Sequence, residues 1–227
     1  INANIKKLSF DEASGFQLEK LSLNLKSNRD SAYIDHFEIR LPNTQVKINK
    51  ANMNIAGIDG LTSVLNNASM ELNIAPSTIG LKDISPFIPA FSHFKESIEL
   101  SSEASGTINN INLKHLTMQQ GNRMLFNGQM DLKWIRSPEE TYIFGKVYRM
   151  LTTREGISLL ANYVNDHPIT VPDPGMRLGT VNFTGEISGF FDNLVAYGVL
   201  STDIGAIQTD IIFGKDKEKN IAVYIKR

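Results

Sequence analysis

Apolar and polar residues alternate along most of the chain with a period of two. Leu21, Leu23 and Leu25, for example, alternate with Ser22 and Asn24. The same alternation recurs at 1–5, 37–41, 46–48, 53–55, 70–74, 98–100, 124–126, 130–132 and 221–225. Because this period places successive side chains on opposite faces of a strand, the pattern predicts an antiparallel sheet with one apolar and one polar face.

Short clusters of Asn, Asp, Ser, Pro and Gly separate the alternating segments. These residue types favour turns through their backbone freedom or their local hydrogen bonds. The predicted turns are 27–30, 42–43, 57–60, 119–122 and Asn127-Gly128. Strands separated by short turns usually pair with their sequence neighbours, so a meander is expected.

One motif occurs twice and indicates repeated β-units. Gly106-Thr-Ile-Asn-Asn-Ile111 is echoed by Gly189-Phe-Phe-Asp-Asn-Leu194, and strand-like segments flank both copies. The predicted corners of these units are Gly106, Asn110, Gly189 and Asn193. Further glycines expected to mark bulges, tight turns or close backbone approach are Gly185, Gly198 and Gly205.

Two regions depart from the alternation. Residues 84–94 are apolar, aromatic and interrupted by proline, which predicts a short helical insert. Ser137-Pro-Glu-Glu140 has the residue order of a helix start, and apolar residues at helical spacing follow it. Helices are therefore predicted over about 140–151 and 154–165, followed by a proline-rich loop.

These segments predict a mainly β chain in three parts. The first, 1–136, holds the first β-repeat unit or units and the insert near 84–94. The second, 137–177, holds the helical pair and the proline-rich loop, and the third, 178–227, is a second β-repeat unit that continues the sheet. Because the chain begins and ends in strand-like alternation, we expect a fragment of a longer polypeptide or a processed chain.

Composition narrows the function. The 227 residues carry 23 basic and 24 acidic side chains, and this dispersed, balanced charge disfavours a nucleic-acid-binding surface. Cysteine is absent, which excludes disulfides, thiolate metal sites and cysteine nucleophiles. No apolar stretch is long enough for a membrane span.

The residues that carry enzymatic chemistry are not grouped in the sequence. No two of the 4 histidines stand three or four positions apart, as a helical metal site would need. Asp131, Asp203 and Asp210 are interpreted as turn or strand-edge residues. We therefore expect no catalytic residues, no metal and no cofactor.

The apolar face of the predicted sheet is the remaining candidate site. Its predicted lipid-groove residues are Leu21, Leu23, Phe37, Ile39, Met70, Leu72, Leu100, Phe126 and Leu132. A sheet hides such a face by packing on another sheet, on helices or around an apolar ligand. The sequence leaves open whether the face forms a lipid-sized trough or a closed sandwich with a dry core.

Several segments resemble the AsmA-like superfamily. They are 8–10, 15–21, 39–43, 81–89, 178–191 and 198–205. Within that superfamily the chain looks most like the translocation and assembly module TamB proteins of Bacteroidetes-type bacteria, over about residues 8–213. The shared motifs are β-repeat signatures and include no catalytic residues.

The resemblance implies a fold and a function. Such proteins are anchored in the inner membrane and cross the periplasm as a curved, groove-like or taco-like antiparallel sheet with an apolar interior. They are associated with phospholipid movement between the two membranes and with outer-membrane protein assembly beside a barrel partner. By this resemblance, the chain is expected to be a non-enzymatic periplasmic segment that binds acyl chains and contacts membranes only through regions outside 1–227.

Two other functions remain open at this point. One is a structural or adhesive β-repeat module that has a closed core and binds protein. The other is a glycan-active enzyme, which would need two carboxylates facing each other at about 5–10 Å.

Overall fold

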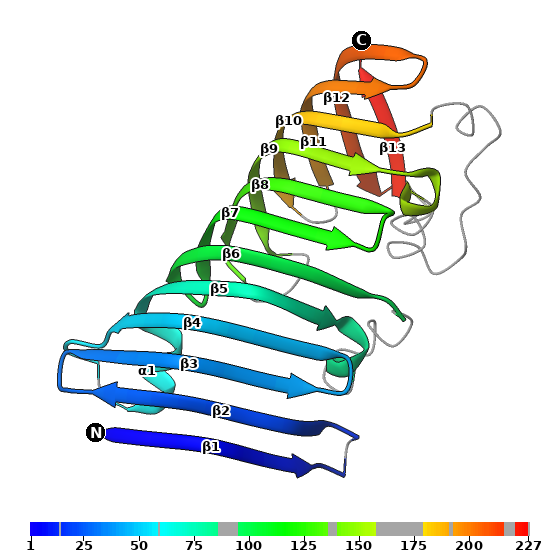
Figure 1. The fold of residues 1–227 in the computed structure, drawn as a ribbon. Coiled ribbons are helices and arrows are strands. Elements are labelled where there is room, and N and C mark those ends of the chain that lie inside the picture. The colour runs from blue at the N-terminus through cyan, green and yellow to red at the C-terminus, as the bar shows by residue number, and fades with distance from the viewer. Residues whose placement is uncertain are drawn as a thin grey trace. The chain divides into compact units, whose positions relative to one another are not determined.

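The chain is built from antiparallel strands that pair in sequence order. The computed structural model describes residues 1–13, 15–58, 60–85, 95–135, 140–157, 179–190, 193–215 and 221–226. The strands form one 13-stranded sheet, ordered β1 to β13, that is not closed (Figure 1). The chain divides into two compact units, Ile1–His115 and Leu116–Arg227. The predicted mainly β, antiparallel fold is confirmed.

The first unit contains six complete strands and two short helical elements. In chain order they are β1 (Asn2–Asp11), β2 (Gln17–Ser27), β3 (Ser31–Leu41), β4 (Thr44–Asn54), α1 (Leu61–Asn67), β5 (Ser69–Gly80), the 3-10 helix η1 (Leu81–Ile84) and β6 (Ser97–Thr107). The boundary between the units falls within β7 (Asn110–Gln120).

The second unit continues the meander. Its strands are β8 (Met124–Lys133), β9 (Tyr142–Thr152), β10 (Val181–Phe190), β11 (Asn193–Thr202), β12 (Gly205–Lys215) and β13 (Ile221–Lys226). Each of them pairs antiparallel with its sequence neighbours within the unit.

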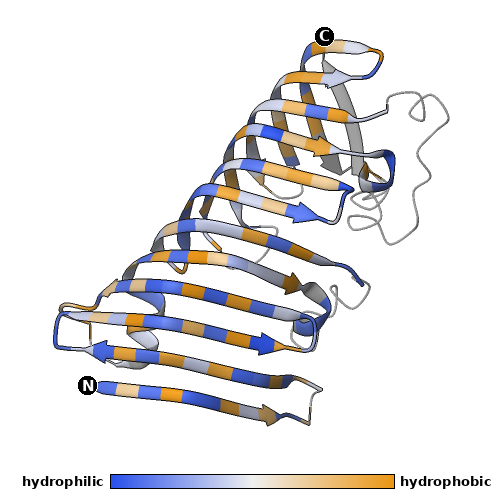
Figure 2. Ribbon diagram, viewed as in Figure 1, coloured by the Kyte–Doolittle hydropathy of each residue, from blue (hydrophilic) through white to orange (hydrophobic). Residues whose placement is uncertain are grey.

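Cross-strand register collects apolar side chains on one face of the first unit. Hydrophobic and hydrophilic residues alternate along its strands (Figure 2). Directly paired residues point to the same face. One apolar row crosses β1 to β6 and consists of Ala3, Leu25, Ile34, Ala51, Leu72 and Ala104.

Irregularities in these strands keep the apolar face continuous. In β3, His36 adopts a positive φ of 52°, and Leu23 of β2 lies opposite both His36 and Phe37. Such a bulge changes the spacing of same-face residues from two to three, as from Ile34 to Phe37. β5 has a similar register shift between Ile74 and Ser77.

A row of three glycines and one valine crosses the second unit. Gly128, Val147, Gly185 and Gly198 are aligned from β8 to β11. A Cβ at Gly185 would lie 2.1 Å from the Tyr197 carbonyl oxygen, so only glycine permits this approach. We call this row the glycine crease. Figure 1 shows that the strands of this unit bend, whereas β1 to β4 curve only gently.

Strand β1 pairs irregularly with β2. Its pairing with β2 shifts register between Ile5 and Leu8 and again between Leu8 and Phe10. Lys6 and Lys7, at the first shift, are both exposed. The hydrogen-bond ladder between β1 and β2 is therefore interrupted at two basic side chains.

The predicted helix at about 140–151 is wrong, because Tyr142–Thr152 form strand β9. Ile143 and Val147 are buried, whereas Phe144 and Tyr148 are exposed, as alternation in a strand requires. Register shifts on both sides of β9 leave Tyr148 as an extra residue. This bulge puts Val147 and Met150 three positions apart on one face, which imitates helical spacing.

Other sequence predictions have mixed outcomes. Asn127-Gly128 is not a turn but lies inside β8, where Gly128 belongs to the glycine crease. Residues 154–157 are helical, as predicted, while the rest of that helix and most of the insert at 84–94 lie outside the described residues. Helix α1 was not predicted. Its N-cap is Gly60, which has no side chain to form a capping hydrogen bond and so gives no helix-start signal in the sequence.

The glycines that begin the two copies of the repeated motif have equivalent surroundings. Gly106 and Gly189 have φ values of 123° and 132°. A Cβ would lie 2.1 Å from the Asn110 carbonyl oxygen in the first copy and 2.2 Å from that of Asn193 in the second. Both glycines are thus required by conformation and by space.

Replacing Gly189 by alanine is expected to destabilise the second unit by about 1–3 kcal/mol, because the substitution adds backbone strain and a steric clash. Urea unfolding followed by circular dichroism measures the loss. Gly205→Ala is the matched control, since Gly205 has a φ of 146° but nothing within 4 Å of its Cβ position. Equal losses in the two variants would contradict the steric argument.

Candidate functional site

The predicted groove residues of the first unit all lie on its apolar face. By strand register, this face includes Leu21, Leu23, Phe37, Ile39, Met70, Leu72 and Leu100. Every one of these side chains is half-buried rather than buried or fully exposed. The face therefore remains partly accessible over β2 to β6.

Residues that the prediction omitted extend the same face. They are Leu25, Ile34, Ile48, Met53 and Ile74, all half-buried. The alternation marked most of them as apolar. Their place on the face depends on cross-strand register and bulges, which a single sequence does not display.

Few large side chains are fully buried in the first unit. Among the described residues, its buried hydrophobic positions are Leu18, Leu41, Ala32, Ala51, Ala68 and Ala104. Alanine offers little apolar surface, so most of the large apolar groups on this face keep contact with solvent. This incomplete burial makes the face a candidate contact surface.

The second unit buries more of its large apolar side chains. Its described buried hydrophobic residues are Leu116, Phe126, Ile143, Val147, Val181, Phe183, Ala196 and Ile211. Val147 is only 1% exposed and Phe126 only 8%. Of the two groove candidates on β8, Phe126 is thus enclosed in a core, while Leu132 is half-buried.

An open cavity of about 710 Å³ lies at strand ends of the first unit. Met53 and Met70 contribute apolar lining, and Asp30 and Glu71 contribute carboxylates. Gly106, a predicted repeat corner, also lines it. This volume is in the range typical of sites for small organic ligands.

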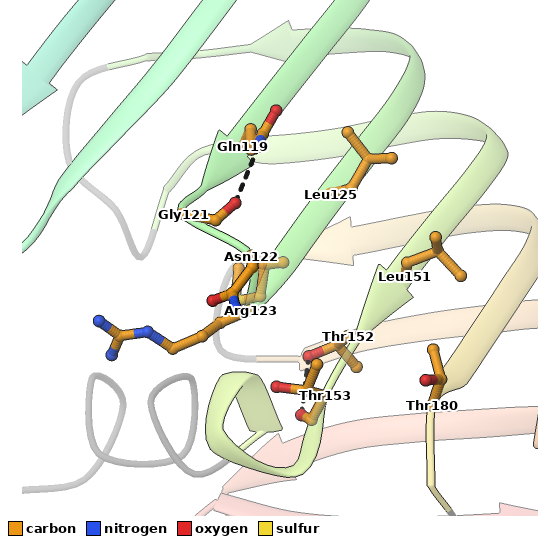
Figure 3. Close-up of a pocket in the computed structure, with 10 residues that line it drawn as sticks. Gln119, Gly121, Asn122, Arg123, Leu125, Leu151, Thr152, Thr153 and Thr180 are labelled. Atoms are coloured by element: carbon orange, nitrogen blue, oxygen red, sulfur yellow. Dashed lines mark hydrogen bonds between the residues drawn. The ribbon is translucent and has the colours of Figure 1, made fainter.

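A smaller cavity of about 250 Å³ lies in the second unit (Figure 3). Leu125, Leu151 and Thr180 line one part of it, and Gln119 donates a hydrogen bond of 2.8 Å to the Gly121 carbonyl beside it. The described residues that line this cavity include no carboxylate or histidine, so it lacks the usual acid–base groups.

The polar face of the first unit carries a charged cluster. Glu38 accepts hydrogen bonds from the Lys20 ammonium, from Gln45 at 2.6 Å and from Arg40 at 3.1 Å. The bond from Lys20, followed by that from Gln45, lowers the pKa of Glu38 to about 2. This cluster ties β2, β3 and β4 together on the face opposite the apolar rows.

The described residues present no metal centre. No group of three or more His, Cys, Asp or Glu side chains in this part of the chain is placed to hold a metal ion. Asp131 and Asp210 lie within strands, and Asp203 lies in the turn before β12. His36 and His115 occupy left-handed positions within β3 and β7 and are exposed. In the described ranges, no helix has the length and apolar character needed to cross a membrane.

Comparison with known proteins adds no relative. A scan of family models, a search of curated proteins and a search of solved structures each found no match.

Glu38→Gln is expected to lower stability by about 1 kcal/mol near neutral pH, since ion pairs open to solvent are screened. Because the folded pKa of Glu38 lies below its ordinary value of 4.5, the stabilisation is complete above about pH 4.5 and is lost as the pH falls towards 2. Urea unfolding across this range should show the wild type and the variant converging at low pH.

A double-mutant cycle with Lys20→Met provides the control. The cycle isolates the Lys20–Glu38 coupling from other effects of either substitution. An unchanged gap between wild type and Glu38→Gln from pH 7 to pH 2 would show that this cluster does not stabilise the fold.

Proposed function

We propose that this chain is a non-enzymatic periplasmic segment of a TamB-like, AsmA-related protein. In this proposal its apolar sheet face shields phospholipid acyl chains during transport between the inner and outer membranes, and the full-length protein also supports outer-membrane protein assembly beside a barrel partner. Anchorage in the inner membrane and contact with the barrel belong to parts of the protein outside residues 1–227.

The observation that carries the proposal is the half-buried apolar face of the first unit. Its rows run across β1 to β6, and the large side chains on it are not fully covered by the described residues. Removal of each methylene from water contributes roughly 0.8 kcal/mol, so one acyl chain laid on this face gains substantial affinity. Similar apolar side chains along the face provide many equivalent positions, which favours sliding over tight fixation.

A closed protein-binding module is the second candidate function, and the second unit favours it. It buries large side chains such as Phe126 and Phe183 on one face. Exposed apolar side chains lie on its outward face: Tyr148, Val195, Tyr197 and Val199. Aromatic residues are enriched at protein interfaces. Under this alternative, photo-crosslinking captures proteins on the outward face and never lipid on the apolar one.

Native mass spectrometry of the purified chain tests the first proposal. Wild-type protein is expected to retain phospholipid, and Leu72→Asp is expected to reduce retention by about tenfold, because a carboxylate on the apolar face disfavours acyl contact. Asn73→Asp is the matched control: it adds the same charge one residue away, at an exposed position on the opposite face.

Circular dichroism verifies that both variants are folded. A photo-crosslinking residue introduced at position 72 or 73 repeats the comparison without a charge. Folded wild-type protein that carries no lipid and yields no lipid adduct from position 72 would rule the proposal out.

A further inference from the structure

We infer that the side chains of Phe126 and Phe183 fill the space on the second unit's apolar face that an acyl chain would otherwise take, and so confine acyl chains to the first unit. The inference rests on the proposed function, because it specifies where within the chain the lipid is held. It assigns these rings the role of specificity-determining residues that exclude ligand from β8 to β11.

The rings lie in one row across the second unit. Phe126 of β8, Met150 of β9, Phe183 of β10 and Leu200 of β11 are aligned by register. Phe183 is 6% exposed, in contrast to the half-buried Leu72 and Ile34 in the first unit. Two large aromatic groups are therefore removed from water where the first unit leaves its aliphatic side chains partly open.

The glycine crease provides the space that the rings fill. A Cβ at Gly128 would lie 3.0 Å from the Phe126 ring. Cβ atoms at Gly185 and Gly198 would each lie 3.0 Å from the Phe183 ring. Each ring thus packs against a glycine position that has no side chain, and Phe183 covers two adjacent strands.

Among its described residues, the first unit lacks this combination. In its apolar row Ala51 and Ala104 alternate with Ile34 and Leu72, and no aromatic ring belongs to that row. Phe37, on a neighbouring row, is half-buried. In the described residues, aromatic rings are therefore buried in the apolar row of the second unit, whereas the row of the first unit holds alanines and half-buried aliphatic side chains.

Truncating a ring should convert the filled face into an acceptor. Phe183→Ala removes the group that covers Gly185 and Gly198 and leaves a cavity lined by Phe126, Met150 and Leu200, unless the unit collapses around it. Apolar cavities of this kind remain dry and take up apolar ligands. An acyl chain is the matching occupant under the proposed function.

The test uses the full chain and a phosphatidylcholine with a diazirine on one acyl chain. After irradiation, peptide mass spectrometry maps the adducts. Wild-type adducts are expected on β2 to β6 and not on β8 to β11. Phe183→Ala is expected to raise labelling of β8 to β11 by about tenfold, the factor corresponding to nearly two more methylenes in apolar surroundings.

Two further variants complete the experiment. Phe144→Ala, an aromatic truncation at a 40% exposed position on the outward side of β9, should leave the label map unchanged. Phe183→Leu removes the ring but keeps an apolar side chain, so its labelling of β8 to β11 should rise less than that of Phe183→Ala. This variant replaces Phe183→Ala if the alanine variant unfolds.

The outcomes separate this inference from the proposed function. Wild-type adducts spread equally over both units, or a folded Phe183 variant without added labelling of β8 to β11, would overturn the inference while the lipid proposal stands. Absence of adducts from wild-type β2 to β6 would overturn the proposed function. A gain in Phe183→Ala would then show that the rings fill space in the second unit, but not that they confine acyl chains to the first.

Discussion

Removal of one apolar sheet face from water is the requirement on which the rest of this structure depends. Antiparallel pairing directs aligned side chains to the same side, so apolar residues on successive strands accumulate there. The second unit meets the requirement internally, with bent strands, a glycine crease and aromatic rings. The first unit meets it only in part, and its half-buried leucines and isoleucines are the basis of the proposed function.

The sequence predicted strands well and bulges poorly, for a physical reason. Alternation is local, so the strands around Leu21, Phe37 and Met70 could be read directly. A bulge inserts one residue, and in β9 the insertion at Tyr148 made a strand resemble an amphipathic helix. Helix α1 escaped prediction because it has neither a capping side chain nor a long apolar stripe. Which face is open depends on pairing between strands, which no single segment encodes.

The repeated motif predicted the structural role of some glycines but not of others. Gly106 and Gly189 were recognised from the recurring motif, and their matching close approach to Asn110 and Asn193 gives the motif a steric cause. Gly185 and Gly198 were expected to mark bulges, turns or close backbone approach, and close approach is what they provide. Their alignment with Gly128 was not visible, because Asn127-Gly128 has the composition of a hairpin turn.

The irregular pairing of β1 with β2 bears on where the first unit opens. Each register shift interrupts the regular ladder of backbone hydrogen bonds between the two strands. Two shifts fall between Ile5 and Phe10, where Lys6 and Lys7 are exposed. Local opening of the first unit is therefore expected to begin in this part of β1, where the backbone amides would exchange their hydrogens with water earliest.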